Sequence, residues 1–85
     1  MSNKLPHRQD STPNDEVEAK YSNYFQVGHN AFEFVMDFGQ SYQNGQVGVH
    51  TRIVTGPPYA RELLRILQDS IAQYERQFGT IDQTD

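Results

Sequence analysis

The sequence contains no cysteine and no tryptophan, and it has no long apolar run. The absence of cysteine excludes disulfide bonds and zinc sites built from thiolates, and it favours a reducing compartment such as the cytoplasm. No apolar stretch approaches the roughly 20 residues that a membrane-spanning helix requires. The first ten residues, MSNKLPHRQD, also lack the apolar segment of a secretion signal. We therefore expect a water-soluble, cytoplasmic protein without a membrane span.

Basic residues are also few. Seven Lys and Arg stand against 11 Asp and Glu, which gives a net charge of -4 and a pI of about 5.2. This balance argues against nucleic acid as the partner, because a protein that tracks a phosphate backbone needs an excess of basic side chains. The chain has only 85 residues, and a domain of that size buries a modest fraction of its surface. Self-association is therefore expected.

The sequence divides into a polar tail and one domain. Residues 1–19 are rich in Ser, Asn, Asp, Pro and charge, so they cannot bury enough apolar surface to offset the entropy of ordering. From residue 21 onward, aromatic residues and valines occur in three clusters separated by turn residues, as is typical of strands. We predict a flexible tail over residues 1–19, a single domain over residues 20–81 and a C-terminal tail over residues 82–85.

Turn residues divide these clusters into three strands. His29-Asn30 and Asn44-Gly45 fit the central positions of two-residue hairpin turns, although the loop GQSYQNGQ can also hold a longer turn. For the first hairpin, the predicted pairs are Val27 with Phe32 and Phe25 with Phe34. For the second hairpin, they are Phe34 with Thr55, Met36 with Ile53, Phe38 with Thr51 and Tyr42 with Val47. Both registers place the same apolar side chains on one face, so the sequence predicts a three-stranded antiparallel meander.

A helical pattern follows the third strand, in TGPPYARELLRILQDSIAQYERQFG. Pro57 and Pro58 mark its start and Gly79 its end. Apolar residues form a wide stripe along this segment, which can cover the sheet. Within the stripe, a seam at alternating spacings of three and four consists of Leu64, Leu67, Ile71, Tyr74 and Phe78. Because coiled coils share that spacing, contact with another copy of the helix stays open. The predicted fold class is α+β, a three-stranded antiparallel meander followed by one long C-terminal helix.

On the other face of the predicted sheet, the registers bring an ion pair and an apolar row together. Asp37 lies opposite Arg52, in a position to form an ordinary cross-strand ion pair or to exchange partners with a charged ligand. We favour the ordinary pair. Tyr24, Val35 and Val54 form the row, which is rimmed by polar side chains. A patch of this kind is typical of an interaction surface, unless another segment of the same chain covers it.

No arrangement of residues indicates catalysis. Glu33 and Asp37 stand about 13 Å apart along one side of a strand, further than the carboxylates of a glycosidase. The histidines, at positions 7, 29 and 50, lack the spacing of a metal site. Neither a nucleophile elbow nor a phosphate-binding glycine pattern is present. We therefore expect no catalytic residues, no cofactor and no metal, and a protein that is not an enzyme.

FEFVMDFGQ, followed by HTRIVTGPPYARELLRILQDSIAQYERQFGTI, resembles a family of short bacterial and archaeal proteins classified as a domain of unknown function. In that family, a Phe-Val-Leu-Asp-Phe-like strand precedes an Arg-Ile/Val-Val strand, a Ser-Pro-x-His-Ala-Lys-like helix start and a final Tyr-Glu-x-x-Phe-Gly. The resemblance covers about residues 21–81. Gly56, Pro57, Tyr59 and Arg61 stand where the family often has Ser, Pro, His and Lys. Because that Ser and that His are missing, neither a side-chain N-cap nor any role of the His is carried over.

The sequence supports three hypotheses about function, in decreasing order. The first is a small interaction or structural module that forms a homo-dimer or a larger homo-oligomer and binds an unknown protein partner. The second rests on a similarity of outline to SecB-type export chaperones, which also have a meander followed by a long helix. In that case exposed aromatics such as Tyr24, Phe25 or Tyr42 would bind unfolded polypeptide. The third is nucleic-acid binding through the helix arginines, of which Arg61 and Arg65 share a face.

Overall fold

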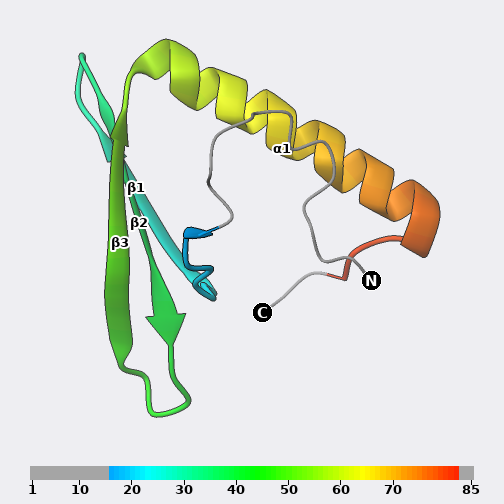
Figure 1. Cartoon of the computed structure of the whole chain (residues 1–85), viewed down its shortest axis with the longest axis horizontal. Coiled ribbons are helices and arrows are strands. Elements are labelled where there is room, and N and C mark those ends of the chain that lie inside the picture. The colour runs from blue at the N-terminus through cyan, green and yellow to red at the C-terminus, as the bar shows by residue number, and fades with distance from the viewer. Residues whose placement is uncertain (1–15, 83–85) are drawn as a thin grey trace.

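The computed structural model describes residues 16–82, and it confirms the predicted fold class. Three antiparallel strands form one sheet in the order β1-β2-β3, and one long helix follows (Figure 1). The elements are β1 (Tyr24–His29), β2 (Phe34–Ser41), β3 (Val47–Thr55) and α1 (Pro57–Phe78). The predicted tail over residues 1–19 and the C-terminal tail lie largely outside the described residues.

The turn between β1 and β2 is longer than the predicted two-residue turn at His29-Asn30. The Asn30 side-chain oxygen accepts the N–H groups of Phe32 and Glu33, at 2.7 and 3.0 Å, and the Asn30 N–H donates to the Glu33 carbonyl. An asparagine side chain that binds the backbone ahead of it in this way stabilises a turn. Phe32 therefore lies in the turn with 83% of its surface exposed, and its predicted place on the inner face of the sheet is wrong.

This longer turn shifts the register of the first hairpin by four residues. Phe25 lies opposite Phe38 rather than Phe34, and Val27 lies opposite Met36 rather than Phe32. The rings of Phe25 and Phe38 meet edge to face at 5.8 Å, an arrangement favoured by the aromatic quadrupole. Because four is an even number, the shift leaves every β1 side chain on its predicted face. The predicted pairs were wrong although the predicted face was right.

The second hairpin follows the predicted register over its first half. Phe34 pairs with Thr55 and Met36 with Ile53, and the same register continues to Phe38. Beyond Phe38, β3 contains one extra residue, a β-bulge. The chain then turns through residues 42–46, where Gly45 has a φ of 86°.

The bulge lies at His50, between Thr51, the partner of Phe38, and Val49, the partner of Gly39. It explains why the predicted pairing of Tyr42 with Val47 is wrong. A Cβ atom on Gly39 would collide with the carbonyl oxygen of Gly48, so the close approach of β3 requires glycine at position 39.

The ends of α1 match the predicted start and stop signals. Gly56 is the N-cap and makes no side-chain capping bond, and Pro57 occupies the first helical position. At the other end, Gly79 has a φ of 96°, and its N–H donates to the carbonyl of Glu75 at 3.0 Å. This left-handed backbone favours glycine, which accounts for the end of the helix at this residue.

The sheet and α1 enclose no core. The helix begins beside the end of β3 and runs away from the sheet, so that only its first turns face the strands (Figure 1). Among residues 16–82, Gly39 alone is buried, and no large apolar side chain is. The predicted stripe therefore does not cover the sheet within one chain. The apolar faces of both elements stay in contact with solvent.

Candidate interaction surfaces

Asp37 and Arg52 form a two-bonded ion pair on the outer face of the sheet, the face turned away from α1. They are direct cross-strand partners on β2 and β3, as predicted. The Arg52 Nε donates to Oδ1 of Asp37 at 2.7 Å, and the Nη2 donates to Oδ2 at 2.9 Å. The carboxylate side chain is 14% exposed and the guanidinium side chain 65% exposed. Parallel bonds of this kind fix the relative orientation of the two planar groups.

The pair changes the acidity of both groups. Hydrogen bonding from Arg52, helped by its positive charge, lowers the pKa of Asp37 below its ordinary value of 3.8 against the opposing effect of desolvation. The same bonds raise the pKa of Arg52. Asp37 is therefore ionised at neutral pH with each carboxylate oxygen already accepting a bond. This geometry fits an ordinary structural ion pair.

The predicted apolar row on the outer face is divided. Val35 lies between Val54 on β3 and Gly28 on β1, so those two valines are neighbours as predicted. Tyr24 lies opposite Gly39, four residues further along β2, and its hydroxyl donates to the Gln26 side chain at 2.8 Å. The predicted contact of Tyr24 with Val35 is therefore wrong, because it depended on the two-residue turn.

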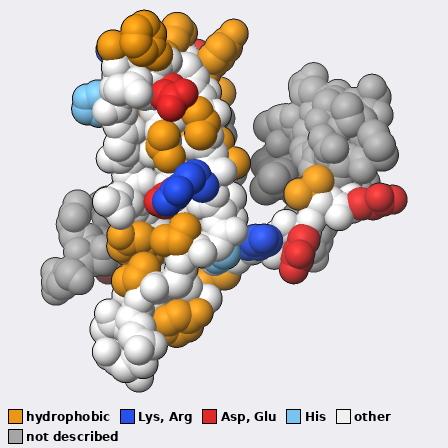
Figure 2. All heavy atoms as spheres, turned by 90° about the vertical axis from the view of Figure 1, so that its left-hand side faces the viewer, with side chains coloured by type: hydrophobic (Ala, Val, Ile, Leu, Met, Phe, Trp, Pro, Cys, Tyr) orange, Lys and Arg blue, Asp and Glu red, His pale blue; other side chains and the backbone are white. Residues whose placement is uncertain are grey.

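The β-bulge adds two valines to the outer face that the sequence did not place there. Val49 pairs with Gly39 and Val47 with Ser41, so both side chains point to the outer side. They are 49% and 46% exposed. Figure 2 shows this face, with hydrophobic side chains on both sides of a central pair of opposite charges. The close approach required at Gly39 was the signal that could have located the bulge.

On the inner face, the sheet and the first turns of α1 form an open apolar cleft of about 460 Å³. Its apolar lining consists of Phe25, Val27, Phe34, Met36, Phe38, Ala60, Leu63, Leu64 and Leu67. Phe25 and Val27 are 61% and 59% exposed. The cleft is thus the space that a packed core would occupy.

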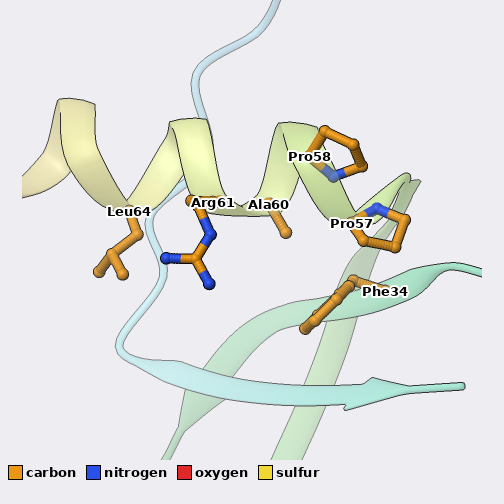
Figure 3. Close-up of a pocket in the computed structure, with 6 residues that line it drawn as sticks. All are labelled: Phe34, Pro57, Pro58, Ala60, Arg61 and Leu64. Carbon is orange, nitrogen blue, oxygen red and sulfur yellow. The ribbon is translucent and has the colours of Figure 1, made fainter. Parts of the chain in front are cut away.

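A second recess, of about 590 Å³, lies where α1 begins, and it shares part of its lining with the cleft. Figure 3 shows Ala60, Arg61 and Leu64 directed from the helix toward the strand that carries Phe34. Pro57 approaches Phe34 from the helix start (Figure 3). Arg61 is the one charged residue in this lining.

The predicted seam of α1 is exposed along its whole length. The exposed fractions are 52% for Leu64, 53% for Leu67, 40% for Ile71, 49% for Tyr74 and 71% for Phe78. The rings of Tyr74 and Phe78 lie 5.0 Å apart. The second half of this seam extends beyond the cleft, whose lining ends at Leu67.

Elsewhere on the helix, Arg65 is held by two acids. Its Nη2 donates to Glu62 at 2.6 Å, and its Nη1 donates to Asp69 at 3.1 Å. Hydrogen bonding and charge from Arg65 lower the pKa of Glu62. Arg65 therefore lies beside two negative charges, which reduces its attraction for a phosphate group.

The histidines of the described chain do not converge. The His50 ring accepts or donates a bond at the Thr51 hydroxyl (2.7 Å), and its Nε2 donates to the Tyr21 carbonyl (2.9 Å). The His29 ring stacks on Phe34 at 5.4 Å. Within residues 16–82, no three His, Cys, Asp or Glu side chains gather as metal ligands would. In the same range, no helix has the length and apolar character to cross a membrane.

Together, the open sheet faces and the exposed helix seam define a small α+β protein whose apolar surfaces are arranged for contact with another molecule. The chain belongs to the family DUF3467, described as a protein of unknown function, whose profile matches residues 2–83. This match confirms the resemblance to a family of unknown function. No curated protein and no solved structure matches the chain.

Proposed function

We propose that this protein is a non-enzymatic interaction module that acts as a homo-oligomer. The observation that carries this proposal is the absence of any buried large apolar side chain among residues 16–82. Burying one Leu, Ile or Phe side chain contributes about 1.5–3 kcal/mol, and the ordering of each residue costs free energy that must be offset. A single chain that leaves both the cleft and the helix seam in water lacks this contribution.

A second copy supplies surfaces of the right chemistry. The seam continues past Leu67, where the cleft ends, as a row formed by Ile71, Tyr74 and Phe78. Its spacing suits packing against another helix or an apolar sheet face. Homo-oligomers with apolar, core-like interfaces are the usual solution for chains that expose such surfaces.

Sedimentation equilibrium of the full chain tests this proposal. At micromolar concentration we expect the mass of a dimer or a multiple of it. The helical and strand signals in circular dichroism should weaken on dilution together with that mass, because assembly and folding are coupled. A folded species that stays monomeric up to about 100 μM would contradict the proposal, because permanent interfaces of this kind bind more tightly than that.

The open cleft supports a second function, in which the module binds unfolded polypeptide as a chaperone. Of the three aromatics expected in such a groove, Phe25 lines the cleft, whereas Tyr24 points to the outer face and Tyr42 lies in a turn. Light scattering of an unrelated aggregating protein, with and without a molar excess of the chain, measures this activity. Suppression that is lost in Phe25→Ser and kept in Tyr42→Ser would support it, and no effect of the wild-type chain would remove it.

Nucleic-acid binding has the weakest support. Arg65 is paired with Glu62 and Asp69, and the chain carries a net charge of -4. Arg61 contributes one positive charge beside the recess at the start of α1. A mobility shift with mixed DNA and RNA that disappears as salt is raised would favour this role, and unshifted bands at low salt would exclude it.

A further inference from the structure

β1 is an open edge of the sheet. The strand order β1-β2-β3 gives it a neighbour on one side, and no other segment among residues 16–82 pairs with it. Five of its six residues are exposed. An open edge presents a row of backbone donors and acceptors that can pair with a further strand.

The phase of the first hairpin identifies the backbone groups on this edge. The Asn30 N–H donates to the Glu33 carbonyl at 3.0 Å, and this pair has the same register as the rest of the hairpin. Backbone direction alternates along an antiparallel strand. The even-numbered residues of β1 therefore bond to β2, and Phe25, Val27 and His29 direct their N–H and C=O groups outward.

Nothing in β1 prevents this edge from pairing. Protected edges carry a lysine, a proline, an inward-pointing charge or a bulge. The β1 sequence YFQVGH contains no charged Lys, Arg, Asp or Glu and no proline, and its register with β2 is continuous. The other edge strand, β3, has a bulge at His50 and carries Arg52. The two edges of the sheet therefore differ, and β1 is the one suited to pairing.

We propose that the open edge of β1 pairs antiparallel with β1 of a second copy, which joins two sheets into one of six strands. This inference rests on the proposed homo-oligomer and names its surface. A second copy fits because β1 meets itself without opposing like charges, whereas two β3 strands would bring their Arg52 side chains near each other. A two-fold axis normal to the sheet also places Phe25 and Val27 of both copies on one continuous inner face.

Symmetry and backbone direction limit the register to two choices. Outward-facing residues must meet outward-facing residues, so a register that pairs Phe25 with Gly28 of the second copy is excluded. Two registers remain that pair five residues of each strand. In one, Gln26 lies opposite Gln26 of the second copy, and in the other, Val27 lies opposite its own counterpart.

Single-cysteine variants test this pairing directly, because the chain has no cysteine of its own. Gln26→Cys reports the first register and Val27→Cys the second. Directly opposed residues of an antiparallel pair have Cα atoms about 4.5–5.5 Å apart, within the range that a disulfide spans. The matched control is Val54→Cys, an equally exposed residue on the other edge strand: Val27 is 59% and Val54 55% exposed.

Under mild oxidation at equal protein concentration, we expect one of the two β1 variants to form about tenfold more disulfide-linked dimer than Val54→Cys, because pairing holds the thiols at a millimolar effective concentration. The linked dimer should keep the wild-type circular dichroism spectrum and the wild-type mass in sedimentation.

A wild-type chain that sediments as an oligomer, while neither β1 variant links above the control, would overturn the pairing and leave the proposed oligomer intact. A monomeric wild-type chain would contradict both. Linkage of the β1 thiols to an added cysteine-containing unfolded polypeptide, in preference to a second copy, would assign the edge to a client strand and overturn the proposal.

Discussion

Among single residues, Gly39 has the most specific structural role. It is the buried residue at the point where the β2–β3 register changes, and a side chain there would strike the backbone of Gly48. The bulge that it permits turns Val49 and Val47 to the outer face of the sheet. One missing Cβ atom thus determines which side chains that surface displays.

Gly39→Ala should destabilise the protein by about 1–3 kcal/mol, because the added carbon forces the two strands apart. Gly28→Ala is the matched control, since a Cβ atom at that strand position meets nothing within 4 Å. The control should be neutral or slightly stabilising, as alanine has less backbone freedom to lose. Urea unfolding at one fixed protein concentration measures both variants. Equal stability of the two variants would refute the role assigned to Gly39.

The Asp37–Arg52 pair predicts a specific response to acid. The folded-state pKa of Asp37 is lowered from 3.8, so its contribution to stability is fully present above that value and is lost as pH falls through the folded-state pKa. Asp37→Asn should therefore lower stability at pH 7 and flatten the decline of stability below about pH 4. Thermal unfolding between pH 2 and pH 7 measures this difference.

Glu33→Gln provides the comparison, because the Glu33 carboxylate has no hydrogen-bond partner within residues 16–82 and lies on the same strand face by register. The control should keep the wild-type acid dependence. An Asp37→Asn curve that runs parallel to the wild type throughout this pH range would show that the pair makes no contribution.

Among the elements, α1 is the one whose sequence and surroundings disagree most. Its caps and its apolar seam are those of a helix that packs against something along its length, yet the cleft receives only its first turns. The second half of the seam exposes Ile71, Tyr74 and Phe78. An amphipathic helix in water gains little from its apolar face, so this half of α1 is where assembly should stabilise the chain most.

Ile71→Glu should weaken self-association at least tenfold, since it places a charge in an apolar interface at a cost of about 1.4 kcal/mol or more. Gln73→Glu adds the same charge to an exposed position away from the seam and should leave the dissociation constant unchanged. Sedimentation velocity over a dilution series gives both constants. An equal effect of the two variants would attribute the change to net charge rather than to the seam.

At the level of the whole molecule, the described chain is a sheet and a helix joined at one end with an unfilled cleft between them. Proteins are stable by a small margin even when they have a core. A homo-oligomer solves this problem by closing the apolar faces of one chain with those of another. Stability then becomes a property of protein concentration as well as of sequence.

The midpoint of thermal unfolding should therefore fall by several degrees for each tenfold dilution, because mass action favours the separated, unfolded chains. Differential scanning fluorimetry from micromolar to hundreds of micromolar chain measures this shift, and far-ultraviolet circular dichroism provides an independent probe. A midpoint that does not change over this range would be evidence for a chain that is stable on its own.

The sequence by itself determined the order of the elements, the ends of α1 and the face of each strand. These features depend on local rules: alternation of apolar side chains, prolines and glycines at helix ends, and the presence of turn residues. The Asp37–Arg52 pair and the register from Phe34 to Phe38 were also predictable, because they follow from one turn and the period of two.

The tertiary structure alone decided which residues are neighbours across β1 and β2, where β3 bulges and how α1 leaves the sheet. The Asn30 side chain lengthened the first turn, and a shift of four residues is invisible to a pattern with a period of two. The collision at Gly39 depends on two backbones that are distant in sequence. The open cleft is likewise a relation between elements, since the same apolar stripe suits a helix packed on its own sheet or on another copy of the chain.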